Sequence, residues 1–211
     1  MVGLLGPNGA GKTTCFYIIA GLIKPDNGKV NIGKTDITGY PVYERARIGL
    51  GYLPQEMSIF KGLSVEDNLL SIIETKEFDN HKRYQILEDL LVEFNITKIR
   101  SSLGITLSGG ERRRVEIARC IASNPTHILL DEPFSGIDPI AIQDLKNLIG
   151  YLKQRNIGVL ITDHNVKDTL DIVDRAYVLG EQSIIADGTP SEILKSSKAI
   201  QLYFGNQYSS N

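Results

Sequence analysis

A glycine-rich loop near the start of the chain restricts the possible folds more than any other feature. It follows the apolar run Val2–Leu5, precedes a stretch of helical character from Thr13 to Leu22, and reads Gly6-Pro7-Asn8-Gly9-Ala10-Gly11-Lys12-Thr13. This is the pattern G-x-x-x-x-G-K-[ST], in which a buried strand ends in a loop that opens a helix. The sequence therefore predicts an α/β fold in which the first strand leads into this loop.

The composition of the loop predicts phosphate binding. Glycines let successive backbone N–H groups turn inward around an anion, and a helix N-terminus adds partial positive charge. Lys12 can reach the β- and γ-phosphates of a nucleotide, and the Thr13 hydroxyl can bind Mg²⁺. A chance glycine loop is the alternative, which the flanking strand and helix disfavour. The predicted nucleotide-binding residues are Gly6, Pro7, Asn8, Gly9, Ala10, Gly11, Lys12, Thr13 and Thr14.

Strand-like and helical patterns alternate along most of the chain, which favours a mainly parallel sheet. Residues 1–54 and 108–190 are expected to form this catalytic α/β core. Residues 55–107 show no strong strand pattern but contain helical spacing, so they predict a helical subdomain inserted into the core. Residues 191–211 are expected to form C-terminal helices and a tail, which is polar and frayed from Asn206 onward. The predicted strands after Val2–Leu5 are Val30–Ile32, Ile48–Leu53, His127–Leu130, Gly158–Thr162 and a closing hairpin of Ala176–Leu179 with Ser183–Ala186.

Composition excludes some classes of function. Hydrophobic residues make up 42% of the 211 residues, enough for a sizeable core, and the formal net charge is -2. A dedicated nucleic-acid binder would normally be basic, so we expect no nucleic-acid partner. No apolar run approaches the roughly 18 residues that span a membrane. Cys15 and Cys120 are expected to be reduced thiols, because the chain shows no signal peptide.

Two acidic residues follow the apolar run Ile128–Leu130. Asp131 stands where a strand that neighbours a phosphate loop would place a Mg²⁺-holding aspartate. Glu132 comes next and could orient or deprotonate an attacking water. Acids also end strands on solvated faces, but beside a phosphate loop the functional interpretation is favoured.

A second glycine-bearing segment is Leu107-Ser108-Gly109-Gly110-Glu111. Ser108 and Glu111 fit a capping box for a helix through Ala122. A capped helix start with two glycines also exposes backbone donors to an anion, and the two interpretations are compatible. One nucleotide needs only one glycine loop. The spare loop therefore predicts a homodimer in which each chain lends Ser108, Gly109 and Gly110 to its partner's nucleotide.

These motifs together resemble the ATPase subunits of ABC transporters. The resemblance covers residues 1–164 in the family's order: the phosphate loop, Gln55 in Tyr52-Leu53-Pro54-Gln55, the signature Leu107–Glu111, the Asp131-Glu132 pair, the D-loop Ser135–Asp138 and the switch His164. It implies a P-loop ABC ATPase domain that binds ATP and Mg²⁺. Thr13, Gln55 and Asp131 would hold the metal, while Glu132, His164 and Gln55 would be catalytic. Without this context, His164 would be taken for an ordinary surface or core residue.

The segments Tyr52–Asn68, Gly109–Arg119, Ile161–Val166 and Gly188–Leu194 are similar to the ATPase subunits of lipopolysaccharide export transporters. This resemblance implies a peripheral protein at the cytoplasmic face of the inner membrane. Transmembrane permease subunits would be its only contact with the membrane. They would dock in a groove around Gln55 and the helical insertion. Arg112–Arg114 could instead form a nucleic-acid patch, but successive helix positions point in different directions.

The family also has strands before the phosphate loop, with an aromatic residue that stacks on adenine. Met1 stands only five residues before Gly6, so these antiparallel strands are expected to be largely missing, and the chain to be a truncated or mis-started version of a longer one. Two alternatives to a transport ATPase stay open from the sequence. One is a non-transport ABC protein that acts on ribosomes or DNA, and the other is a partner-binding remnant with impaired turnover.

Overall fold

A six-stranded sheet organises the molecule. The computed structural model describes residues 1–204 of the chain. The strand order is β4-β5-β6-β1-β7-β8, and every neighbouring pair is parallel except β7 and β8, which form an antiparallel hairpin. This confirms the predicted α/β fold with a mainly parallel sheet. The strands are β1 (Val2–Leu5), β4 (Leu50–Leu53), β5 (His127–Asp131), β6 (Gly158–Thr162), β7 (Arg175–Gly180) and β8 (Ser183–Gly188).

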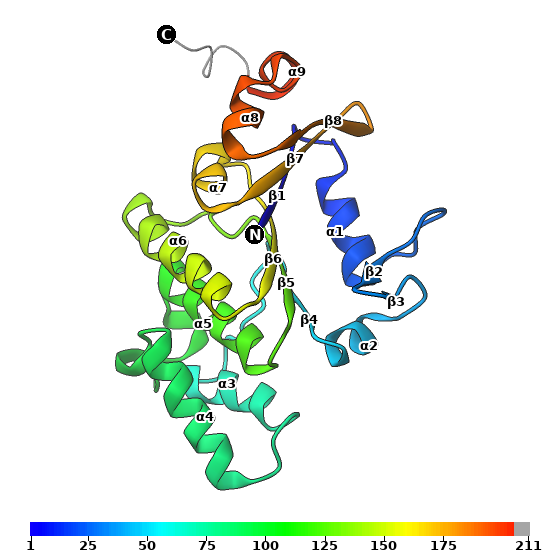
Figure 1. Cartoon of the computed structure of the whole chain (residues 1–211). Coiled ribbons are helices and arrows are strands. Elements are labelled where there is room, and N and C mark those ends of the chain that lie inside the picture. Colours follow the sequence, from blue (N-terminus) through cyan, green and yellow to red (C-terminus); the bar gives the residue numbers. More distant parts are fainter. Residues whose placement is uncertain (205–211) are drawn as a thin grey trace.

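Helices cover both faces of this sheet, because alternate side chains of each strand point to opposite faces. In β1, Leu4 packs toward Phe16 of helix α1, while Leu5 belongs to the larger core on the other face. Figure 1 shows α1 and α2 on one side of the sheet and α5, α6 and α7 on the other. The helices of the core are α1 (Lys12–Ala20), α2 (Val42–Arg47), α5 (Gly109–Ala122), α6 (Pro139–Gln154) and α7 (Val166–Ile172).

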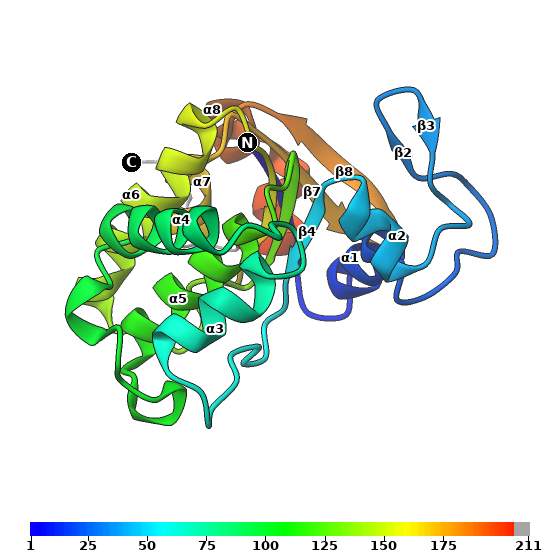
Figure 2. The ribbon, with the colours of Figure 1, turned by 90° about the horizontal axis from the view of Figure 1, so that it is seen from below.

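The stretch expected to be a helical insertion contains helices α3 (Val65–Ile73) and α4 (Asn80–Glu93). Ser64 caps α3 by accepting a hydrogen bond from the Asp67 N–H. The two helices pack with α5 at one end of the molecule. Figure 2 shows this group on the opposite side of the sheet from the hairpin of β2 (Asn31–Ile32) and β3 (Thr35–Asp36). Two short 3-10 turns, Thr97–Ile99 and Gly104–Thr106, lead from α4 back to α5.

Several boundaries differ from the sequence prediction. The first helix ends at Ala20 rather than Leu22, because Gly21 adopts a left-handed conformation (φ 85°) and its N–H caps the helix. The strand expected at Val30–Ile32 is present as the shorter β2 (Asn31–Ile32), which pairs with β3 (Thr35–Asp36) in a separate two-stranded sheet. The C-terminal region contains α8 (Pro190–Lys195), α9 (Ser197–Ala199) and a π-helical turn, Ile200–Phe204. The predicted frayed tail, 206–211, lies outside the described residues.

Candidate functional site

The phosphate loop connects the end of β1 to the start of α1. Gly6 has a φ of 148°, and a Cβ there would lie 2.4 Å from the Leu179 carbonyl oxygen, so only glycine fits. Lys12 is 6% exposed, and its Nζ donates to the carbonyl oxygens of Gly6 (2.8 Å) and Pro7 (3.0 Å). Burial lowers the pKa of Lys12, while the charges of Glu132 and Asp131 act in the opposite direction. The Lys12 ammonium group therefore lies close enough to Glu132 and Asp131 to interact with their charges.

Asp131 ends strand β5 and is 2% exposed. Its Oδ2 accepts a hydrogen bond of 3.3 Å from the Tyr52 hydroxyl, whereas its Oδ1 is buried without a partner among the described residues. Burial raises the pKa of the carboxyl group, and the nearby Arg113 and Lys12 charges oppose that rise. A buried carboxylate oxygen that accepts no hydrogen bond is suited to bind a cation. Carboxylate oxygens are ligands that Mg²⁺ accepts.

Glu132 brings together the three residues expected to be catalytic. Gln55 Nε2 donates to Glu132 Oε2 at 2.6 Å, and His164 Nε2 lies 2.6 Å from Glu132 Oε1. The Glu132 side chain is buried, and this desolvation raises the pKa of its carboxyl group despite the opposing effect of His164. Gln55 and His164 are both exposed at the surface beside it. Gln55 is 77 positions from Glu132 in the sequence, and His164 is 32 positions from it. The fold thus brings both side chains to the same carboxylate.

Two residues of this region were not identified from the sequence. Tyr52 contacts Asp131, and burial raises the pKa of its hydroxyl. Asp163 is 2% exposed and accepts hydrogen bonds from the Phe134 N–H and the Asn165 N–H, both at 2.8 Å. These bonds fix the turn after Glu132 against the turn that carries His164. The one feature of the sequence that could have identified Asp163 is its position directly before His164.

The signature segment forms the predicted capping box at the start of α5. The Ser108 N–H and hydroxyl donate to Glu111 Oε2 at 2.9 and 2.6 Å, and the Glu111 N–H donates to Ser108 Oγ at 3.3 Å. Ser108, Gly109 and Gly110 line a cavity of about 510 Å³ together with Gly136 and Asp138 of the D-loop. None of the residues that line this cavity belongs to the phosphate loop. Within the described part of the chain, the two glycine loops therefore serve separate surfaces.

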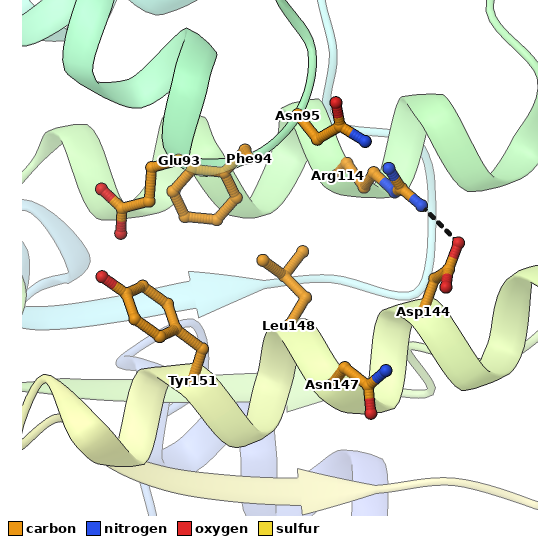
Figure 3. Close-up of a pocket in the computed structure, with 8 residues that line it drawn as sticks. All are labelled: Glu93, Phe94, Asn95, Arg114, Asp144, Asn147, Leu148 and Tyr151. Atoms are coloured by element: carbon orange, nitrogen blue, oxygen red, sulfur yellow. Dashed lines mark hydrogen bonds and ion pairs between the residues drawn. The ribbon is translucent and has the colours of Figure 1, made fainter.

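A neighbouring cavity of about 430 Å³ lies between the end of α4, α5 and α6. Figure 3 shows Arg114 directed toward Asp144, to which it is bonded at 2.7 Å. Arg114 thus points outward to α6, whereas Arg113 is buried, as expected for adjacent helix positions. This cavity contains none of the residues predicted for nucleotide binding or catalysis.

Comparison with known proteins decides the family. The family model described as ABC transporter matches residues 1–135. The chain belongs to the ABC transporter ATPases. The prediction of an ATP-binding subunit that hydrolyses ATP is thereby confirmed.

Individual relatives agree with this family. The chain is 52% identical to the lipopolysaccharide export system ATP-binding protein LptB of Haemophilus influenzae, over 99% of the chain and 87% of that protein. It is 55% identical to a probable ABC transporter ATP-binding protein of Azorhizobium caulinodans, over 98% of the chain and 74% of the relative. Among solved structures, the ADP conformation of the ATP-binding cassette MJ1267 is similar, with a TM-score of 0.83 and 29% identity over 98% of the chain and 88% of that cassette.

Proposed function

We propose that this ABC ATPase powers the export of lipopolysaccharide through transmembrane partner subunits, from the cytoplasmic face of the inner membrane. The observation that carries the proposal is the identity of 50–52% over 99% of the chain with several proteins named LptB, lipopolysaccharide export system ATP-binding protein. Among residues 1–204, no helix has the length and apolar character needed to cross a bilayer.

ATP would bind with its phosphates over the N-terminus of α1, held by residues 6–14. For this, Lys12 must exchange its bonds to Gly6 and Pro7 for bonds to the β- and γ-phosphates. Thr13, Gln55 and Asp131 are proposed as the Mg²⁺ ligands, and the free Oδ1 of Asp131 supports this assignment. When bound there, the metal would supply positive charge that offsets the negative charge of the phosphates.

Glu132 is proposed to orient and deprotonate the attacking water, with His164 contacting the γ-phosphate. Both roles require Gln55 and His164 to release Glu132, because their contacts occupy both of its carboxylate oxygens. A general base must also be close enough to its proton to form a hydrogen bond. Release of Gln55 toward the metal and of His164 toward phosphate would therefore free Glu132 for water.

The working unit is proposed to be a homodimer. The Ser108–Gly110 segment lines a cavity with Gly136 and Asp138, which the phosphate loop of the same chain does not reach. In a dimer with two-fold symmetry, each chain presents the same two surfaces to the other. Placing one chain's α5 N-terminus against the γ-phosphate held by its partner would supply the backbone donors that the second glycine loop exposes.

The transmembrane partners are proposed to dock in a cleft beside the Gln55 loop. Its volume is about 260 Å³, and its lining residues come mainly from strand β4 and from helices α1, α2, α3 and α5. Ala46 and Ile72 lie on its two sides, and Arg119 stacks over the exposed Phe60 ring at 5.0 Å. An apolar cleft between core and helical region suits a short amphipathic helix.

Co-purification tests the proposal. The tagged chain is expressed in its native host, membranes are solubilised gently, and associated proteins are identified by mass spectrometry. Recovery of transmembrane proteins, with ATP hydrolysis that rises when lipopolysaccharide is supplied in proteoliposomes, is expected. Ala46→Glu should abolish this recovery, while Val92→Glu, on an exposed site of α4, should not. Recovery of ribosomal or DNA-associated proteins alone would refute the transport function.

A further inference from the structure

Helix α5 contains an ion pair that lies inside the protein. Arg113 is 5% exposed and Glu116 is 2% exposed, and Arg113 Nη1 donates to Glu116 Oε2 at 3.0 Å. The two residues are one helical turn apart, so both side chains leave the same face of α5. This face is directed toward the sheet edge that carries the proposed catalytic residues.

The remaining contacts of the pair are with the backbone of the catalytic region. Arg113 Nη1 donates to the Pro54 carbonyl oxygen at 3.0 Å, and Nη2 donates to the Asp131 carbonyl oxygen at 3.1 Å. Glu116 Oε1 accepts from the Ser58 N–H at 2.9 Å. Pro54 precedes Gln55 and Asp131 precedes Glu132. The pair thus joins both sides of the Gln55–Glu132 contact and also holds the Gln55 loop at its far end.

Stability alone is a poor explanation for this arrangement. Removing two charges from water is costly, and well-packed apolar residues often serve equally well or better. Here the Arg113 Nε is also buried without a partner in the described part of the chain. Yet only a guanidinium offers a planar set of donors that can reach two carbonyl groups and a carboxylate together.

We propose that Arg113 and Glu116 form a positioning pair that sets the place of Gln55 relative to Glu132 and links both to the signature helix. The inference deepens the proposed function, since it rests on the roles of Gln55 and Glu132 in hydrolysis. Because α5 carries Ser108–Gly110 at its N-terminus, a shift of this helix is transmitted by the pair to the backbone on both sides of the catalytic contact. Neither residue is catalytic, because neither reaches the substrate.

The test measures kcat and KM for ATP in the full-length protein. Arg113→Lys keeps the charge, but a single ammonium cannot replace the planar guanidinium across both carbonyls. The double variant Arg113→Gln with Glu116→Gln removes both charges together, so that no buried charge is left without its partner. Misplacement of catalytic groups by about 1 Å costs about 100-fold in rate. We expect kcat to fall by about 10- to 100-fold in both variants, with KM for ATP within about threefold of wild type, because the phosphate loop is untouched.

Arg175→Gln is the matched control, because this arginine pairs with Asp187 at the surface of the β7–β8 hairpin and should leave kcat unchanged. The inference is overturned if Arg113→Lys retains the wild-type kcat. It is also overturned if the double variant folds and retains the wild-type kcat. A raised KM with unchanged kcat would also overturn it. If the double variant does not fold, the lysine variant decides. Failure of the proposed function is separate, since loss of the transport role would appear in the co-purification experiment and would leave wild-type turnover of ATP unchanged.

Discussion

Glu132 holds a backbone conformation that few glutamates adopt. Its φ is 46°, in the left-handed region, and its N–H donates to the Thr162 carbonyl oxygen at 2.8 Å. Such a conformation costs about 1–3 kcal/mol and persists where neighbouring structure enforces it, often at functional sites. Here it turns the side chain away from the line of β5 toward Gln55 and His164. The strain is thus associated with the residue proposed as the base.

Replacing this carboxylate with an amide should stop turnover without preventing nucleotide binding. Glu132→Gln cannot accept a proton from water, so steady-state phosphate release should fall by about 100-fold or more, and an ATP-bound dimer should accumulate on gel filtration. Glu181→Gln is the matched control, because Glu181 is an exposed glutamate that also has a positive φ, 49°. Phosphate release near the wild-type rate in Glu132→Gln would exclude Glu132 as the base.

The two thiols should differ in reactivity. Burial raises the pKa of Cys120 from 9.0 to about 12, and it also raises the pKa of the less enclosed Cys15. Thiolate is the nucleophile, so a pKa above the working pH slows alkylation. At pH 8 we expect iodoacetamide to modify Cys15 before Cys120 in the folded protein, and both thiols after denaturation. Peptide mass spectrometry measures both sites, and equally fast labelling of Cys120 in the folded chain would contradict this.

At the scale of elements, the sequence predicted what depends on local pattern. The phosphate loop, the capping box at Ser108 and the β7–β8 hairpin are each encoded by neighbouring residues, and the structure contains them. The short helices α2 and α7 were not predicted, because a few turns carry little periodicity. A strand was predicted at Val30–Ile32, but the pattern did not indicate that it pairs with β3 outside the main sheet.

Contacts between distant elements were the least predictable part. Sequence motifs identified candidate site residues, but nothing local indicates that Tyr52 bonds to Asp131 or that Arg113 reaches two strand-end carbonyl groups. Arg113 looked like one of three equivalent arginines. Its burial is decided by the rotation of α5 against the sheet, which is a property of the packed molecule.

The packing of β4 against α5 leads to a prediction about Gly51. A Cβ at this position would lie 2.6 Å from Cys120 Sγ, and overpacking of this kind costs about 1–3 kcal/mol. Gly51→Ala should lower the midpoint of thermal unfolding. Cys120→Ala in addition should restore most of the loss by removing the sulfur.

Gly150→Ala provides the opposite control for this experiment. Gly150 lies within α6, and a Cβ there meets nothing within 4 Å. Alanine should stabilise this helix by about 0.4–1 kcal/mol, because it restricts the unfolded chain. Differential scanning calorimetry compares the variants. If Gly51→Ala unfolds at the wild-type temperature, β4 and α5 are less tightly packed than the structure indicates.

At the scale of the whole molecule, the two glycine segments are proposed to be halves of two different nucleotide sites. The phosphate loop lies at the end of β1, and the Ser108–Gly110 segment opens onto a cavity shared with the D-loop. A symmetric dimer would combine one half from each chain, so that both sites depend on both chains. This arrangement can be separated from a self-sufficient monomer by mixing two inactive variants.

Lys12→Ala removes the lysine proposed to bind phosphate in one chain, and Gly110→Asp places a repelling carboxylate in the signature segment of the other. Each variant alone should form dimers in which both sites are damaged. A mixed dimer has one site that combines an intact phosphate loop with an intact signature, and one site damaged twice. With random pairing, an equal mixture should therefore recover about a quarter of wild-type ATP hydrolysis. Phosphate release is measured after mixing and compared with the sum of the two separate variants. Activity equal to that sum would show that each chain completes its own site, and the signature would then act within one subunit.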